Sequence, residues 1–156
     1  MKKYSQLALA IIGCELVGIV STPFTISAIP TWYRTLNKPF FSPPNWIFGP
    51  VWTTLYLLMG ISAFLIWQKG LKKKKVKEAI TYFGIQLFLN FIWTFLFFGL
   101  RNPLLGLIDI VVLWIFIVLT IVKFYKLSRP AAYMLIPYLL WVSFATILNS
   151  SILILN

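Results

Sequence analysis

The sequence contains no histidine, one cysteine and only three acidic residues, and each scarcity excludes a class of function. Without histidine the chain cannot form a serine–histidine triad, an HExxH zinc site or a histidine-ligated haem. Cys14 stands alone, so no intrachain disulfide can form. There is also no glycine-rich phosphate loop. The sequence therefore predicts no metal site, no required cofactor and no conventional catalytic motif.

Charged residues are scarce as well, and apolar residues are correspondingly abundant. Only 11% of the 156 residues are charged and 60% are hydrophobic, whereas soluble domains average about 25% and 45–50%. The apolar residues form continuous runs without the alternation that barrel strands require. We therefore predict an all-α integral membrane protein, a five-transmembrane-helix bundle forming a single domain over residues 1–156. The predicted spans are about 5–27, 46–68, 79–100, 104–122 and 131–155, with a proline- and aromatic-rich lid loop at 28–45.

The first apolar run follows Lys2 and Lys3, as the core of a cleavable signal peptide would. It is longer than such a core, and Ile26-Ser27-Ala28 is a poor cleavage site. We expect a retained span.

The basic residues indicate how the bundle lies in its membrane. Of the 14 Lys and Arg residues, eleven lie at the amino terminus and in the second and fourth loops. Arg34, Lys38 and Arg101 are the other three. The positive-inside rule then predicts a multi-pass cell-membrane protein with a cytoplasmic amino terminus and an outer carboxyl terminus. Since the charges fall between apolar runs and do not form one basic face, the net charge of +11 favours anionic lipid over nucleic acid as a partner.

Two amides lie within the third predicted span. Gln86 and Asn90 are four residues apart, and Trp93 and Phe97 continue the same helix face. Buried amides commonly link neighbouring helices by hydrogen bonds. They also suit a site for a ligand with a few polar atoms, so both interpretations stand.

Mid-span tryptophans favour the ligand interpretation. Trp93, Trp114 and Trp141 lie where no interfacial anchoring applies, and an indole N–H at that depth needs a partner or a cavity. Two further spans present aromatic faces: Trp52, Tyr56 and Met59 on one, and Tyr138, Trp141, Ala145 and Leu148 on the other. Such faces predict a pocket for a flat apolar ligand, although plain core packing produces the same pattern.

Two carboxylates also fall within predicted spans. Glu15 and Asp109 suggest ion or proton coupling, because charged groups in a bilayer are costly. The structural alternative is a protonated or hydrogen-bonded Glu15 and an Asp109 paired with Arg101, and we favour that pairing for Asp109.

Spaced, rare residues over about 28–149 resemble the signature of the TspO/MBR family, the tryptophan-rich sensory proteins and translocator proteins (peripheral-type benzodiazepine receptors). The first blocks are Trp32-Tyr33 to Leu36, Lys38-Pro39, Pro43-Pro44, Trp46, Phe48-Gly49-Pro50-Val51-Trp52-Thr53, Leu55-Tyr56 and Met59-Gly60. The later blocks are Gln86-Leu87, Asn90, Trp93, Phe97-Phe98-Gly99, Asp109, Pro137-Tyr138-Leu139, Trp141, Phe144-Ala145 and Leu148-Asn149. The tyrosine and arginine that complete a proposed cholesterol motif in animal members are absent after Asn149.

The resemblance implies a bacterial-type five-helix bundle, commonly a homodimer, with a pocket closed by the first loop. It implies binding of porphyrins (protoporphyrin IX and haem) and of isoquinoline carboxamide or benzodiazepine-type ligands. By position, the family pocket includes Trp52, Asn90, Trp93, Tyr138, Trp141, Ala145 and Leu148, and its lid includes Trp32 and Tyr33. Phe48, Tyr56, Gln86 and Phe97 complete the ligand-binding residues that we predict.

Three functions are compatible with these residues. The first is a membrane receptor or transporter that binds tetrapyrroles. The second is an enzyme-like, light-dependent oxidative degradation of protoporphyrin IX, in which Trp52 and Trp141 would be catalytic. The third is an ion- or proton-coupled transporter that uses Glu15 and Asp109.

Overall fold

The fold is a bundle of long helices without strands over residues 2–156, the part of the chain that this computed structural model describes. The elements are α1 (Lys3–Ala28), η1 (Ile29–Tyr33), η2 (Asn45–Ile47), α2 (Phe48–Trp67), α3 (Lys74–Thr94), η3 (Phe95–Gly99), α4 (Pro103–Leu127), α5 (Arg129–Met134) and α6 (Ile136–Leu155). They form five segments long and apolar enough to cross a membrane: Lys3–Tyr33, Asn45–Trp67, Lys74–Gly99, Pro103–Leu127 and Arg129–Leu155. The predicted all-α five-span architecture is therefore confirmed.

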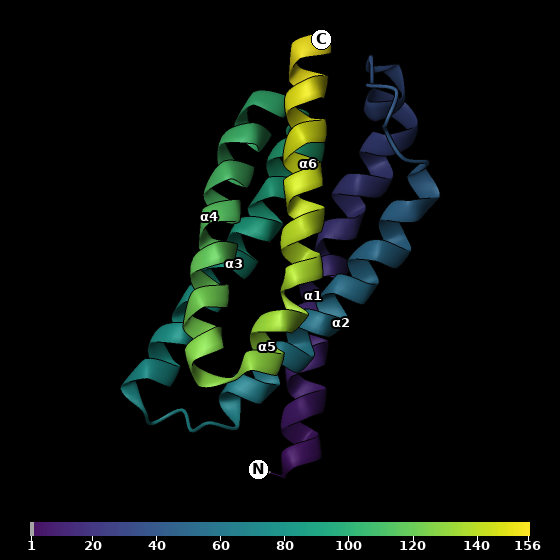
Figure 1. Ribbon diagram of the computed structural model, residues 1–156. Coiled ribbons are helices and arrows are strands. Elements are labelled where there is room, and N and C mark those ends of the chain that lie inside the picture. Colours follow the sequence, from purple (N-terminus) through teal and green to yellow (C-terminus); the bar gives the residue numbers. More distant parts are fainter. Residues whose placement is uncertain (1) are drawn as a thin grey trace.

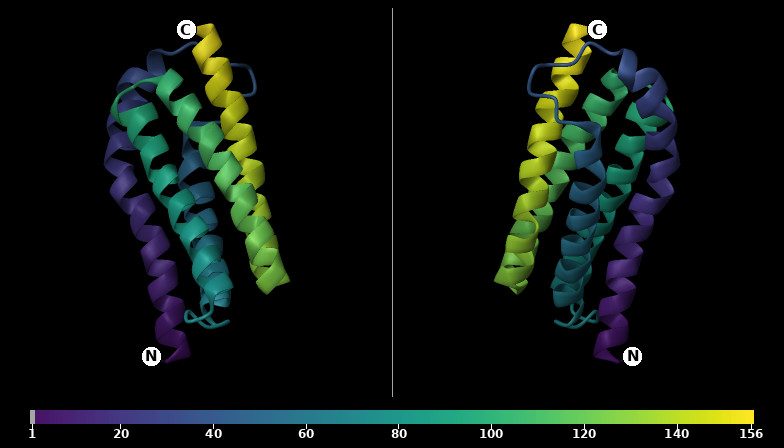
Figure 2. Two further views of the ribbon diagram at one scale, coloured as in Figure 1. Left: turned by 90° about the vertical axis from the view of Figure 1, so that its left-hand side faces the viewer. Right: turned by 90° about the vertical axis from the view of Figure 1, so that its right-hand side faces the viewer.

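The helices run roughly parallel and antiparallel around a common axis, and the two termini lie at opposite ends (Figure 1). α1 packs mainly on α2, α3 on α4, and α4 on α6, while α2 meets the fifth span through α5. Towards the end that carries the carboxyl terminus, α2 and α6 diverge (Figure 1). The lysine-rich connection between α2 and α3 lies at the amino-terminal end (Figure 2).

Helix ends follow local sequence signals. The side chain of Asn102 caps α4 by accepting a hydrogen bond from the Leu105 N–H, and Pro103 occupies the first turn, where no backbone donor is needed. Ser128 caps α5 in the same way. These caps fix the two tight connections that lead into and out of α4.

The first loop is shorter than the predicted lid loop at 28–45. The helix continues through Ala28 into η1, where the Arg34 N–H bonds to the carbonyl of Ile29, five residues back. Pro30 has no N–H to donate, and a widened turn lets the helix continue past it. Residues 34 and 35 are still helical, so the irregular loop covers only residues 36–44.

The fourth span is longer than the predicted 104–122. α4 runs to Leu127, so Lys123, which suggested a span end, lies within the helix, and its side chain pairs with Glu78 on α3. A lysine at a span end keeps its charge in a polar position without breaking the helix.

The two halves of the bundle are packed differently. At the amino-terminal end the helices close on a fully buried apolar core that includes Ile66, Val76, Phe124, Ala131 and Leu135. Ser62 on α2 adds a hydrogen bond of 2.7 Å to the Ala131 carbonyl on α5. Because the helices pack closely at this end, the open space between the diverging helices lies in the opposite half of the molecule.

Candidate functional site

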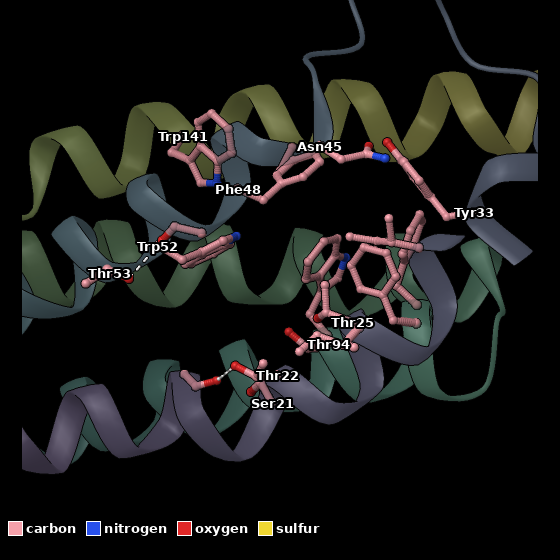
Figure 3. Close-up of a pocket in the computed structure, with 18 of the residues that line it drawn as sticks. Ser21, Thr22, Thr25, Tyr33, Asn45, Phe48, Trp52, Thr53, Thr94 and Trp141 are labelled. Atoms are coloured by element: carbon pink, nitrogen blue, oxygen red, sulfur yellow. Dashed lines mark hydrogen bonds between the residues drawn. The ribbon is translucent and has the colours of Figure 1, made fainter. Parts of the chain in front are cut away.

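A cavity of about 590 Å³ lies between α1, α2, the α3–η3 segment and α6. Figure 3 shows its lining, with Tyr33 and Asn45 towards the first loop. Pockets for small organic ligands usually measure about 300–1,000 Å³ and are mainly apolar. The cavity therefore has the size and position of an intramembrane ligand site.

One wall is aromatic and comes from α2 and α6. Figure 3 shows Phe48, Trp52 and Trp141 grouped on this side. The rings of Trp52 and Trp141 meet edge to face with centroids 6.5 Å apart, and Phe48 meets Trp141 at 6.1 Å. Phe144 continues the wall at 5.5 Å from Trp141. The indole N–H groups of Trp52 and Trp141 make no hydrogen bond within residues 2–156, so this wall offers two free donors.

The opposite wall comes from α1, where polar side chains alternate with Ile19 and Ile26, and we call it the polar wall. Glu15, Gly18, Thr22 and Thr25 recur at the three- and four-residue spacing that places them on one helix face, and Ser21 joins them. Figure 3 shows Ser21, Thr22 and Thr25 across the cavity from the tryptophans. The Ser21 and Thr22 hydroxyls donate to the carbonyls four residues back at 2.7 Å each. Their oxygens therefore remain available as acceptors.

A third side is formed by α3 and η3. Trp93 and Phe97 stack with centroids 5.2 Å apart. The Trp93 N–H donates to Asn149 Oδ1 at 3.0 Å, and the Asn149 amide donates to the Pro103 carbonyl at 2.8 Å. These two bonds hold the stacked pair against α6 and α4. Trp114, by contrast, donates to Ser143 Oγ at 2.8 Å and does not line the cavity.

Behind the cavity lies a buried polar network that joins three spans. Tyr56 on α2 donates to Asn90 Oδ1 at 2.5 Å, and the Asn90 amide donates to the Tyr138 oxygen on α6 at 2.9 Å. The Tyr138 hydroxyl then donates to Gln86 Oε1 at 2.7 Å, and Gln86 Nε2 points at the Met59 sulfur at 3.9 Å. The two amides thus link helices by hydrogen bonds, one of the two roles expected of them.

Two adjacent residues near the start of the first loop, Asn37 and Lys38, anchor it to the rest of the bundle. Lys38 Nζ lies 4.8 Å from the centre of the buried Tyr33 ring and donates to the carbonyls of Tyr33 and Leu36. Asn37 and Asn156 exchange hydrogen bonds: the Asn37 N–H donates to Asn156 Oδ1 at 3.1 Å, and Asn156 Nδ2 donates to the Asn37 carbonyl at 2.9 Å. The loop is therefore latched to the end of α6.

Most of the predicted ligand-binding residues line this one cavity: Tyr33, Phe48, Trp52, Tyr56, Trp93, Phe97, Trp141, Ala145 and Leu148. Four do not. Gln86, Asn90 and Tyr138 lie in the network behind Tyr56, and Trp32 packs edge-on against Phe97 at 5.5 Å.

Several lining residues that the sequence analysis did not assign to a ligand site lie on the polar wall of α1, including Glu15, which it considered only for ion coupling. Others, such as Phe98, Phe144 and Ile152, come from η3 and α6. The signal was present: Glu15, Gly18, Thr22 and Thr25 form a regular stripe in an otherwise apolar span. Treated one by one, each has an ordinary structural explanation, and only their shared face points to a site.

The expected pairing of Asp109 with Arg101 is wrong. Arg101 Nη2 donates to Thr31 Oγ1 at 3.4 Å, and in residues 2–156 the salt bridge present is that of Lys123 with Glu78. Asp109 is buried on α4, and its Oδ2 has no partner in the described part of the chain. Glu15 lines the cavity whereas Asp109 does not, so the structure does not bring the two intramembrane acids to one site.

Comparison with known proteins agrees with this architecture. The TspO/MBR family matches residues 10–155 of the chain. The chain is 48% identical to the tryptophan-rich protein TspO of Chlorobaculum tepidum over 155 residues, 99% of this chain and 98% of that protein. It is 46% identical to the tryptophan-rich protein TspO of Archaeoglobus fulgidus, with 97% of each chain covered.

A mammalian relative is also similar. The chain is 38% identical to the translocator protein of Bos taurus over 137 residues, 86% of this chain and 80% of that protein. The family matches nearly the whole chain, and the chain covers most of the length of each of these relatives. Both findings assign the chain to the same family. This multi-pass membrane protein belongs to the TspO/MBR family.

Proposed function

We propose that the protein is a membrane receptor or transporter whose cavity binds a porphyrin, namely protoporphyrin IX or haem. The observation that carries the proposal is the cavity itself: about 590 Å³, with aromatic rings on one wall and acceptor oxygens on the other. A flat macrocycle can lie against aromatic faces while its few polar atoms meet polar side chains. Membership of a family that includes translocator proteins supports a receptor-like role in a membrane.

The lack of histidine bears on which porphyrins suit the cavity. Since the chain has no imidazole, the cavity suits metal-free porphyrin, or haem held without an imidazole ligand. Isoquinoline carboxamide and benzodiazepine-type compounds share the required shape, a flat apolar body with a few polar atoms. We propose them as synthetic ligands of the same cavity.

Titration with protoporphyrin IX tests the proposal by following the quenching of tryptophan fluorescence in purified protein. Combined replacement Trp52→Phe and Trp141→Phe removes both free indole donors of the aromatic wall and should weaken binding at least about tenfold. Trp46→Phe is the matched control, because Trp46 is 73% exposed and does not line the cavity. An unchanged dissociation constant in the double variant would reject the site.

A second candidate is light-dependent oxidative breakdown of the bound porphyrin by dioxygen. It is favoured by the edge-to-face pair Trp52 and Trp141 at 6.5 Å inside the cavity, because indoles can take part in photo-oxidation without an acid–base dyad. The test is the loss of porphyrin absorbance under light, with one defined product and more than one turnover. Bleaching at the same rate in the Trp52→Phe/Trp141→Phe variant would reject catalysis by this pair.

We further propose that the protein lies in the cell membrane with its amino terminus in the cytoplasm, and that it forms a homodimer. Eleven of the 14 Lys and Arg residues support the orientation by their position in the sequence. For the dimer, Gly13 and Gly84 offer open surfaces where another helix could approach, whereas Gly18 and Gly106 already pack against Tyr56 and Phe97.

A further inference from the structure

Glu15 is the one carboxylate that lines the cavity, and nothing within residues 2–156 neutralises it. It lies on α1, half-buried, and its side chain makes no hydrogen bond or ion pair in that part of the chain. A carboxylate within a membrane span is costly unless it has a partner. A ligand group that donates a proton or carries positive charge would supply such a partner.

The charge of the cavity is opposite to that of the whole molecule. The chain carries a net charge of +11, yet no lysine or arginine lines the cavity. Glu15 is thus the only acidic or basic side chain that a ligand inside would meet at close range. Such a site favours cationic or proton-donating ligand groups over carboxylates.

Aromatic faces adjoin the carboxylate. On α1 and α2, Glu15 and Tyr56 are the lining residues farthest from the first loop, so both mark the deep end of the cavity. A Cβ at Gly18 would lie 2.7 Å from the Tyr56 ring, which shows that this ring rests on α1 one turn from Glu15. The Trp52 ring follows at 5.7 Å from Tyr56. Ring faces beside a carboxylate are the surroundings that recognise an amine cation.

The two walls also differ in hydrogen-bond polarity. The Ser21 and Thr22 hydroxyls use their hydrogens on their own helix, so α1 presents acceptors. The aromatic wall presents free indole donors at Trp52 and Trp141. A ligand is therefore offered acceptors on α1, with Glu15 at the deep end, and donors on the aromatic wall.

We propose that the deep end of the cavity is a subsite for a basic nitrogen: Glu15, backed by the Tyr56 and Trp52 rings, selects flat aromatic ligands that carry an amine or ring N–H there. The nitrogen shares its proton with a Glu15 carboxylate oxygen, and any carboxylates of the ligand face the first loop. This inference rests on the proposed ligand cavity. It narrows the class of ligands expected there from flat aromatic compounds in general to those with a basic end.

Three porphyrins that share one macrocycle test the subsite. They are protoporphyrin IX, its uncharged dimethyl ester, and its bis-amide with N,N-dimethylethylenediamine, which carries tertiary amines. Wild-type protein should bind the amine about tenfold more tightly than the ester, and the acid more weakly than the ester. In Glu15→Gln the amine should lose this advantage while the ester binds as before. Glu78→Gln is the matched control, because Glu78 pairs with Lys123 outside the cavity and its loss should leave the preference intact.

The outcomes separate the two proposals. If wild-type protein binds no member of the series, the ligand cavity itself is rejected. If wild-type protein binds the ester but shows no preference for the amine, the basic subsite is overturned while the cavity stands. An amine preference that persists in Glu15→Gln also overturns the subsite. Ester binding by Glu15→Gln serves as the check that the variant is folded.

Discussion

Asn90 is the residue at which three spans meet. Its carbonyl oxygen accepts from Tyr56 on α2, and its amide donates to Tyr138 on α6, while its own backbone belongs to α3. At 1% exposure it has no access to water, so these bonds cannot be replaced by solvent. A single amide thereby sets the spacing of three helices behind the cavity.

We predict that Asn90→Leu destabilises the bundle more than the removal of either tyrosine hydroxyl. Interhelical hydrogen bonds in membrane proteins contribute about 0.6 kcal/mol each, so Tyr56→Phe should lower stability by roughly that amount. Asn90→Leu leaves the Tyr56 and Tyr138 hydroxyls without their shared partner and should cost about 1–3 kcal/mol. Thermal unfolding in detergent measures both.

Tyr133→Phe is the control for this comparison, because Tyr133 is 58% exposed and forms no side-chain hydrogen bond within residues 2–156. Its melting temperature should equal that of the wild type. Melting temperatures of Asn90→Leu and Tyr56→Phe that also match the wild type would show that the network contributes nothing to stability.

The helical spacing of Gln86 and Asn90 was enough to predict one shared face, and the structure places both in one network. Their partners could not be predicted, because the pairing with Tyr138 depends on the relative register of α3 and α6. The same limit explains Asp109. Proximity in sequence suggested Arg101, but Asp109 faces the buried side of α4 while Arg101 lies in an exposed connection.

At the scale of elements, α1 is the span with the least buried surface and yet forms a whole wall of the cavity. It is held mainly by α2. The two backbones come closest at Gly60, where an added Cβ would lie 2.5 Å from Ile11 Cα. Small residues allow such close approach between spanning helices. The position of the polar wall therefore depends on one glycine of α2.

Gly60→Ala is predicted to push α1 away from α2 and to destabilise the protein by about 1–3 kcal/mol, because the clash is with backbone, which cannot rotate away. Gly49→Ala in ligand-free protein is the matched control, since Gly49 lies on the same helix and its Cβ would meet nothing within 4 Å. Thermal unfolding of the two variants measures the effect. Equal melting temperatures would show that this close contact does not constrain α1.

The latch between the first loop and α6 leads to a kinetic prediction. Asn156→Ala breaks the exchange of hydrogen bonds that holds the loop against the end of α6, because both bonds use the Asn156 side chain. A loop that opens more often should release ligand faster, about threefold to tenfold for the loss of roughly 1 kcal/mol. Stopped-flow measurement of protoporphyrin IX dissociation detects this.

Asn37→Ala provides the control for the latch, because the Asn37 atoms in the exchange belong to its backbone and remain in alanine. It removes only the 3.4 Å bond from Asn37 Nδ2 to the Leu155 carbonyl, so it should accelerate release less than Asn156→Ala. Release at the wild-type rate in Asn156→Ala would show that the loop does not gate release.

At the scale of the molecule, the five spans and their alternating direction could be predicted from run length and charge alone, because lipid imposes both. The ends of the spans were harder to predict from the sequence. Pro30 and Lys123 both suggested that a helix stops, yet η1 continues past the proline and α4 continues past the lysine. The polar wall was not predicted because the Ser21 and Thr22 hydroxyls bond within their own helix, and only the shared helix face of the α1 residues, taken together, indicated a site.

The charge distribution leads to the last prediction, the orientation of the whole bundle. The amino terminus and the lysine-rich connection share one end of the structure (Figure 2), and positive loops stay in the cytoplasm. In a Cys14→Ala background, a membrane-impermeant maleimide should label Phe40→Cys on intact cells, because Phe40 is fully exposed in the first loop. Lys72→Cys, in the opposite connection, should be labelled only after permeabilisation. The reverse pattern would place the first loop, and with it the latch and the loop end of the cavity, on the cytoplasmic side.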